Sequence, residues 1–344
     1  MTRKRILAAI MTAALLFGMT SCKLTSCHKS EEELQTTAET GKTVEQMIDD
    51  KNHREADFVL DDVAYAKKTD VSAYLFMGID KSGDLETTNQ AVGGQSDVLL
   101  LFVVDTAGKT QTILQLDRDT MADVEITNYY GKPMGVVRKQ QICFAHTYGS
   151  GDEKSCENTV RAVSRLLGVL GEVQIDGYVS LLYDGIPPIN DTLGGIKVKI
   201  EDDFSDADPT LVEGEVVELT GQHALNFVRG RMTVGDGRNQ SRMRRQRTYM
   251  DAFSARLKEE MHTRSAIIND LYAAAEPYMV TDMSLGAISN LALQTLDYES
   301  GGTLTIDGEL KYEVYPNGNT YTEFHVDEDS LRDTVLALFY TPIN

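Results

Sequence analysis

Seven arginines lie within nineteen residues of a chain whose formal net charge is −20. They are Arg229, Arg231, Arg238, Arg242, Arg244, Arg245 and Arg247. Because like charges repel, such crowding in an acidic protein is favourable where an anion neutralises it. A guanidinium group binds two phosphate or carboxylate oxygens at once, and phosphate is the better match. The stretch therefore predicts an anion site; the alternative interpretation is a solvated basic helix face.

Helical spacing divides these arginines. A long helix is predicted over residues 242–261, with a core stripe of Met243, Met250, Phe253, Leu257 and Met261. Arg242, Arg245 and Tyr249 are related by three, four and seven residues, so they share an adjoining face. Arg244 and Arg247 point elsewhere and are predicted to be solvated. Arg229 and Arg231, two residues apart in an extended segment, point to one side and can act together.

One further arginine and two aspartates stand at strand ends. Arg118 directly follows a predicted strand at 110–116, and ligands collect at such ends in open α/β sheets. Asp80 closes a strand at 73–79, and Asp97 opens one at 98–104. Two carboxylates with phosphate oxygens suit Mg²⁺. Singly, each aspartate is better read as a loop cap or an arginine partner. Together the set predicts a metal-assisted site for a pyrophosphate or phosphodiester.

The elements that must position these residues are strands and helices in mixed order. Further strands are predicted at 178–182, 196–200, 303–306 and 312–314, and further helices at 157–167, 221–228, 267–272, 285–296 and 331–339. The fold class is α/β or α+β: one large domain with a central mixed sheet covered by helices. The 344 residues are long enough for the large core this needs.

The N-terminus carries the pattern of an export signal. Arg3-Lys4-Arg5 precedes an apolar run from Ile6 to Phe17, and small residues then lead to Cys22. Residues 1–22 are therefore a signal peptide or membrane anchor; cleavage with lipidation at Cys22 and an uncleaved anchor are both left open. Residues 23–69 are predicted to be a polar tether, with a helix somewhere within 43–68. The folded domain is expected over 70–344, outside the cytoplasm.

Composition and missing motifs exclude several function classes. The acidic balance argues against bulk nucleic-acid binding. The sequence has no GxSxG, P-loop or HExxH motif. Cys143 and Cys156 either form a disulfide or remain buried thiols, and His146 is interpreted as structural. The acidic loop at 201–208 lacks the glycine and glutamate of a calcium loop, so it is predicted to be solvated.

The residues that carry this chemistry resemble the LytR–CpsA–Psr family. The matching segments, in the family's order, are FMGID at 76–80, QSDVLLL at 95–101, DRDT at 117–120, LGGIKV at 193–198, LTGQHAL at 219–225, VRGR at 228–231, SRMRRQR at 241–247 and TDMS at 281–284. A membrane anchor before the domain is also the family's arrangement. Two departures are QLD at 115–117 and QIC at 141–143, where the family often has SIP and KIN; the missing lysine puts one phosphate contact in doubt.

The resemblance implies an α-β-α sandwich that binds a polyprenyl-pyrophosphate-linked glycopolymer and transfers it to peptidoglycan, forming a phosphodiester. By matched position, Arg118, Arg229, Arg231, Arg242 and Arg245 would hold the pyrophosphate, Gln246 and Arg238 would bind substrate, and Asp80 and Asp97 would serve Mg²⁺ and the acceptor hydroxyl. We therefore expect Arg118→Ala and Arg245→Ala to abolish transfer and leave the fold intact. A polyprenyl-pyrophosphate hydrolase and a non-enzymatic lipid-binding regulator stay open as alternatives.

Overall fold

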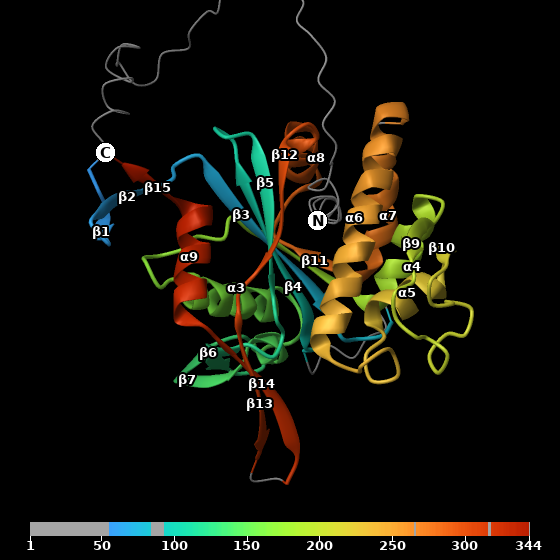
Figure 1. Cartoon of the computed structure of the whole chain (residues 1–344), viewed down its shortest axis with the longest axis horizontal. Helices are drawn as coiled ribbons and strands as arrows, with labels where there is room; N and C mark the ends of the chain where they lie inside the picture. Colours follow the sequence, from blue (N-terminus) through green and yellow to red (C-terminus); the bar gives the residue numbers. More distant parts are fainter. Residues whose placement is uncertain (1–54, 84–92, 265, 316–317, 344) are drawn as a thin grey trace, which may run out of the picture.

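A mixed six-stranded sheet forms the centre of the computed structural model, which describes residues 55–83, 93–264, 266–315 and 318–343 (Figure 1). The strand order is β11-β8-β3-β4-β5-β12. These strands span Met279–Thr281, Gly177–Leu182, Val71–Ile79, Ser96–Asp105, Thr110–Leu116 and Glu299–Thr305, respectively. The three central strands β3, β4 and β5 form an antiparallel meander, and β8 and β12 pair parallel to its two edges. The strands predicted at 98–104 and 110–116 thus form an antiparallel hairpin.

Helices cover both faces of the sheet, which confirms the predicted α-β-α sandwich. On one face, α3 (Glu153–Leu167) and α9 (Glu328–Phe339) pack against buried side chains such as Leu75, Met77 and Leu101. On the other face lie α4 (Ile186–Thr192), α5 (Gln222–Arg229), α6 (Asn239–Thr263), α7 (Ile267–Ala275) and α8 (Leu285–Thr295). Both sheet faces are therefore buried, as expected of the continuous apolar runs in β3 and β4.

The long helix α6 begins at Asn239, three residues before its predicted start. Met243, Phe253, Leu257 and Met261 are buried and Met250 is half-buried, so the predicted core stripe is confirmed. This packing fixes the rotation of α6, and with it the direction of the arginines in its first two turns.

The folded part of the described chain starts earlier than the predicted boundary at Asp70. Strands β1 (Phe58–Leu60) and β2 (Val63–Lys67) occupy the end of the expected tether, where a helix was also predicted. Strand β2 pairs with the C-terminal strand β15 (Tyr340–Ile343), so its partner lies at the other end of the sequence. The signal segment 1–22 and Cys22 lie outside the described residues, and no helix within the described ranges is long and apolar enough to span a membrane.

Several smaller strands lie outside the central sheet, and only some of them were predicted from the sequence. Strands β9 (Ile196–Lys199) and β10 (Val216–Leu219) form one hairpin. Strands β6 (Met121–Thr127) and β7 (Pro133–Gln141) form a second, and β13 (Gly308–Val314) and β14 (Thr320–Val326) form a third that extends beyond the body of the domain (Figure 1). Three short 3₁₀ helices, η1 (Ile142–Thr147), η2 (Tyr183–Gly185) and η3 (Glu276–Tyr278), connect larger elements.

Candidate active site

Asp97 is the carboxylate around which the site is built. It lies at the start of β4 and is 7% exposed. Its Oδ1 accepts a hydrogen bond from Nη1 of Arg118, which follows β5, and its Oδ2 accepts one from Nη1 of Arg242 at 2.7 Å. Nη2 of Arg242 also donates to Asn239 Oδ1 at 2.7 Å. The predicted meeting of two strand ends with the start of the long helix is therefore present in the structure.

Asp117 attaches the loop that carries Arg118 to the same helix. Its Oδ1 accepts hydrogen bonds from the Asp119 amide at 2.9 Å and from Asn239 Nδ2 at 2.7 Å. Its Oδ2 accepts one from Gln240 Nε2 at 2.9 Å. Burial raises the pKa of Asp117 to about 6, although these donors oppose the shift. The DRDT segment and the first turn of α6 thus form one hydrogen-bonded unit.

Arg229 and Arg231 reach this cluster from the end of α5, but they contact different carboxylates. Arg229 Nη2 donates to Asp80 Oδ1 at 3.2 Å, and its guanidinium carbon lies 5.4 Å from the centre of the Tyr183 ring. Arg231 Nη2 lies 3.6 Å from Asp119 Oδ2. Burial lowers the pKa of Arg231, and the charges of Arg118 and Arg242 add to this effect. An anion placed among these groups would offset both the burial of the Arg231 charge and its repulsion by Arg118 and Arg242.

Several buried polar atoms of the cluster have no hydrogen-bond partner among the described residues. The donors are Nε of Arg118, Arg231 and Arg242 and the hydroxyl of Tyr183; the acceptor is Asp119 Oδ2. The Arg118 Nε atom does lie 3.3 Å from Asp119 Oδ1, without hydrogen-bond geometry. Buried donors without acceptors are costly in a folded protein. Four guanidinium groups meet the carboxylates of Asp80, Asp97, Asp117 and Asp119 here, and their open Nε donors are available to an anionic ligand.

Arg245 is not part of this open cluster. Its side chain is 2% exposed, and its Nη1 donates to Asp202 Oδ2 at 2.5 Å. Its Nε donates to the Phe227 carbonyl at 3.3 Å, and its Nη2 donates to the Gly230 carbonyl. Every nitrogen of this guanidinium therefore bonds to α5, to Gly230 directly after it, or to Asp202 in the loop after β9. The structure gives Arg245 a positioning role at the edge of the site.

The remaining arginines of the stretch lie outside the cluster. Arg244 is exposed, as predicted, and contacts Asp202 Oδ1 at 2.6 Å. Arg247 was predicted to be solvated, but it is half-buried and donates to Gln115 Oε1 at 2.6 Å, because the buried arc of α6 is wider than one stripe. Arg238 is exposed at the N-terminus of α6. Gln246 is buried, and its Nε2 donates to the Val228 carbonyl at 3.3 Å.

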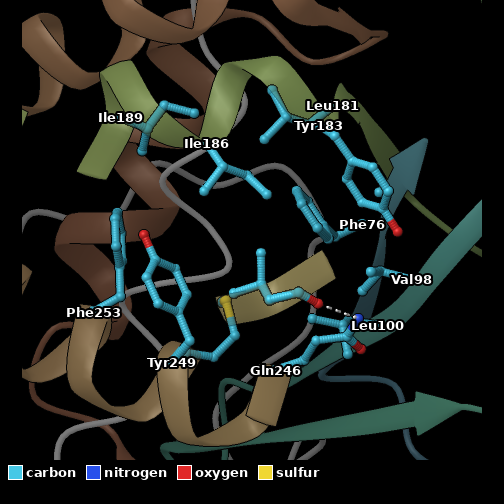
Figure 2. Close-up of a pocket in the computed structure, with 13 residues that line it drawn as sticks. Phe76, Val98, Leu100, Leu181, Tyr183, Ile186, Ile189, Gln246, Tyr249 and Phe253 are labelled. Carbon is cyan, nitrogen blue, oxygen red and sulfur yellow. Dashed lines mark hydrogen bonds between the residues drawn. The ribbon is translucent and has the colours of Figure 1, made fainter. Parts of the chain in front are cut away.

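An apolar cavity opens beside the arginine cluster, between the sheet and the helices (Figure 2). In Figure 2, Tyr249 and Phe253 of α6 face Ile186 and Ile189 of α4 across it. The other labelled residues that line the cavity are Phe76, Val98 and Leu100 of the sheet, Leu181, Tyr183 and Gln246. The cavity has a volume of about 80 Å³. Pockets that enclose drug-sized ligands measure roughly 300–1,000 Å³, so a long chain would require α4 and α6 to move apart.

The cavity and the arginine cluster share residues. Tyr183 lines the cavity and also lies under the guanidinium of Arg229. Val98 lines it and directly follows Asp97, while Gln246 lines it one turn after Arg242. A single amphiphile with an anionic head and an apolar tail can therefore contact both.

The two predicted metal ligands stand at neighbouring strand ends. The Asp80 amide donates to the carbonyl of Gln95, two residues before Asp97, at 2.9 Å. The side chain of Asp80 is 41% exposed, whereas both oxygens of Asp97 accept from arginines. Within the described ranges, no three His, Cys, Asp or Glu side chains are grouped so that they could hold a metal ion. The donor set fits Mg²⁺ only with phosphate oxygens and water as further ligands.

The structure also decides the state of the two cysteines, His146 and the acidic loop at 201–208. Cys143 and Cys156 are free buried thiols, so the disulfide alternative is wrong. The Cys143 sulfur lies 3.1 Å from Arg118 Nη2, and burial raises its pKa to about 11. Burial lowers the pKa of His146 to about 4, and its Nδ1 lies 2.9 Å from the Gly94 carbonyl, which agrees with a structural histidine. The loop at 201–208 is not simply solvated, since Asp202 and Asp208 are buried by their partners.

Three site residues were not assigned from the sequence. Asp119 lies inside the DRDT motif, so its position next to Arg118 was a usable signal. Gln141 stands where the family often has lysine, and its Nε2 donates to Asp119 Oδ1 at 3.3 Å and to the Thr322 carbonyl at 2.7 Å. Tyr183 had no local signal, because only the parallel pairing of β8 with β3 brings it beside Asp80.

Comparisons with known proteins identify the family and the fold. The teichoic acid transferase TagV of Bacillus subtilis, named as a polyisoprenyl-teichoic acid–peptidoglycan transferase, is 30% identical over 284 residues, which cover 78% of this chain and 65% of TagV. The crystal structure of B. subtilis TagV has a TM-score of 0.57 and 24% identity, and covers 78% of this chain and 97% of that one. The structure of TagT bound to LI-WTA has a TM-score of 0.55 and 19% identity. This match covers 78% of this chain and 90% of that one.

The structural likenesses, at under 25% identity, concern the fold, and the chain spans less than two thirds of the length of TagV. The LytR_cpsA_psr family model matches residues 28–338, which include every arginine and aspartate of the cluster. The protein therefore belongs to the LytR_cpsA_psr family.

Proposed function

We propose that this protein transfers a glycopolymer from a polyprenyl-pyrophosphate carrier to a hydroxyl of peptidoglycan, at the outer face of the cell membrane. The observation that carries the proposal is the shared wall between the arginine cluster and the apolar cavity. Tyr183, Val98 and Gln246 line the cavity within a few residues of the groups that would bind a pyrophosphate. The named activity of TagV and the wall teichoic acid ligand of TagT support the same substrate class.

The arginine cluster performs the binding step. The pyrophosphate lies among the unpaired Nε donors of Arg118, Arg231 and Arg242, while Arg229 approaches it from the end of α5. Fixed guanidinium groups stabilise the charge that develops on phosphate oxygens during transfer and need no reorganisation to do so. The prenyl chain extends into the apolar cavity, where Tyr249 and Phe253 line one wall.

The transfer forms one bond and breaks one. The acceptor hydroxyl oxygen attacks the phosphorus that carries the glycan, the P–O bond to the second phosphate breaks, and polyprenyl phosphate leaves with the bond's electron pair. Asp119 Oδ2 is a buried carboxylate oxygen without a hydrogen-bond partner among the described residues, so it is placed to receive the hydroxyl proton. Asp80 and Asp97 would hold a Mg²⁺ ion together with phosphate oxygens and water, and that ion would supply charge neutralisation at the phosphate oxygens.

The test is a transfer assay with a lipid-pyrophosphate-linked glycan, run with and without peptidoglycan. The wild-type protein is expected to form glycan bound to peptidoglycan and to release polyprenyl phosphate. Arg118→Ala should reduce transfer by more than a hundredfold and remain folded, because Asp97 keeps Arg242 as its partner. Arg161→Ala, which removes an ion pair with Glu125 and a hydrogen bond to Asn158 away from the cluster, is the matched control.

Two outcomes would contradict the proposal. Full transfer by Arg118→Ala would show that the arginine cluster does not bind the pyrophosphate. Release of free glycan phosphate at the same rate with and without peptidoglycan, and no bound product, would identify a hydrolase instead.

A further inference from the structure

The hairpin of β6 and β7 ends in a segment whose charge differs from that of the rest of the protein. Residues 128–139, here called the hairpin tip, contain Lys132, Arg138 and Lys139 and no aspartate or glutamate. The whole chain has 53 acidic and 33 basic residues, giving a net charge of −20. All three cationic side chains are exposed, and none has an ion pair with a described residue. The tip is therefore a local cationic surface on an acidic protein.

The same segment exposes large apolar side chains. They are Tyr130 at 80%, Met134 at 59%, Val137 at 52%, Tyr129 at 50% and Val136 at 43% exposure. Single exposed apolar residues are common on protein surfaces, but five within nine residues of one hairpin form a patch. Nearly all of β7 is exposed, because the strand has β6 on one side only.

The tip has a defined shape. Asn128 Oδ1 accepts hydrogen bonds from the amides of Tyr130 and Lys132, both at 3.0 Å. Gly131 takes a left-handed conformation with φ of 71°. The rings of Tyr129 and Tyr130 pack edge to face with centroids 5.3 Å apart. The exposed apolar groups are thus presented by a closed turn.

The base of the hairpin is joined to the active site. Strand β6 begins three residues after Arg118, and Gln141 at the end of β7 donates to Asp119. A strand of seven residues is about 20 Å long, so the tip lies roughly that far from the arginine cluster. In Figure 1 the hairpin lies at the same end of the domain as the first turn of α6.

Acidic groups flank the hairpin at its base and along α3, where Lys154, paired with Glu157 at 2.7 Å, lies against Gly131. Asp123 stands directly opposite Lys139 in the ladder, and Glu125 is bound by Arg161 at 3.1 Å and lies 3.8 Å from Arg165. Cross-strand neighbours lie about 5 Å apart, so Asp123 offsets the charge of Lys139, while Arg161 and Arg165 balance Glu125 and Lys154 balances Glu157. Lys132 and Arg138 remain as exposed cations of the tip without an ion pair among the described residues.

We propose that the hairpin tip inserts into the headgroup region of an anionic lipid bilayer and so brings the arginine cluster to the membrane surface. Tyrosines at the interface, aliphatic side chains below them and cations against anionic headgroups are the features that such a surface requires. A carbohydrate surface would use the tyrosines but gains nothing from the exposed Met134, Val136 and Val137. Insertion itself does not depend on the proposed function, and only the activity measurement below rests on it.

The absence of tryptophan from the chain permits a direct test. Tyr130→Trp in the full chain places one tryptophan at the tip, and Met134→Trp is a second probe in the same segment. Val216→Trp, at a 69% exposed position on β10 at the other side of the domain, is the matched control. Each protein is mixed with vesicles of phosphatidylglycerol and phosphatidylcholine that contain brominated lipid.

Both tip probes are expected to shift to shorter emission wavelength and to be quenched, while Trp at 216 keeps the spectrum seen without vesicles. Replacing Lys132, Arg138 and Lys139 with alanine should weaken docking by about a hundredfold, since each basic residue near an anionic surface contributes about fivefold. Quenching at the tip no greater than at residue 216 would overturn the proposal. So would a shift caused by soluble peptidoglycan fragments and not by vesicles, which would make the tip an acceptor surface.

A transfer assay separates this proposal from the proposed function. The triple alanine variant should lose most of its turnover of substrate held in anionic vesicles and keep wild-type turnover of a short-chain substrate dispersed in detergent. Equal losses in both assays would contradict membrane docking. If the wild-type protein shows no transfer at all, the tryptophan measurement still decides whether the tip inserts.

Discussion

Replacing Arg245 tests whether this residue binds substrate or holds the fold. The sequence predicts that Arg245→Ala abolishes transfer and leaves the fold intact, whereas the structure predicts a large loss of stability. The adjacent Arg244 provides a matched control, because both arginines donate to Asp202, at 2.5 Å and 2.6 Å. The two side chains differ in burial, at 2% and 44% exposure.

The expected magnitudes follow from that difference. Arg245→Ala leaves the carbonyls of Phe227 and Gly230 without this donor and removes one partner of a buried ion pair. Removing one partner of a buried pair costs about 3–5 kcal/mol. Arg244→Ala removes a solvent-screened pair worth about 0–1 kcal/mol. For a domain of this size, the first change corresponds to a melting temperature lower by roughly 10 °C.

Urea unfolding followed by far-ultraviolet circular dichroism measures both values, since the chain has no tryptophan to report by fluorescence. The reasoning is refuted if the two variants lose equal stability, or if Arg245→Ala unfolds within about 1 kcal/mol of the wild-type protein. In the second case Arg245 would be free to act on the pyrophosphate.

Three further predictions concern the cavity, pH and magnesium. Met250→Trp, which fills the cavity, should raise KM several-fold for long prenyl chains and leave short-chain substrates unaffected; equal effects on both would exclude the cavity as the lipid site. Because burial raises the folded-state pKa of Asp117 from 3.8 to about 6, this group destabilises the fold as pH rises from about 4 to about 6, by about 3 kcal/mol. The difference in unfolding free energy between wild type and Asp117→Asn should change by that amount between pH 4 and pH 7, and a pH-independent difference would contradict it. Asp80→Asn should weaken Mg²⁺ binding at least tenfold by calorimetric titration with pyrophosphate present, and unchanged affinity would remove Asp80 from the metal site.

Local patterns were sufficient for the main elements of the fold. Strands β3, β4 and β5 and helices α3, α6 and α9 follow from apolar runs and from helical spacing, because their burial is periodic. Strands β1 and β2 form a short local hairpin that was not predicted from the sequence, and the partner β15 on the other side of β2 lies at the opposite end of the chain, where pairing has no local signal. The β6–β7 hairpin was missed because β7 is exposed and lacks a buried pattern.

By itself, the sequence determined the fold class and most of the charged residues that meet in the cluster, although not Asp119. Helical spacing correctly placed Arg242, Arg245 and Tyr249 on one buried face of α6. Helical spacing does not determine which carboxylate each guanidinium binds, because the carboxylates lie on segments from elsewhere in the chain. Only the tertiary structure decided that Arg242 meets Asp97, at the start of β4, while Arg245 meets Asp202, in a loop on another side. The physical reason is that positions three residues apart on one helix point about 60° apart, so Arg242 and Arg245 reach different partners.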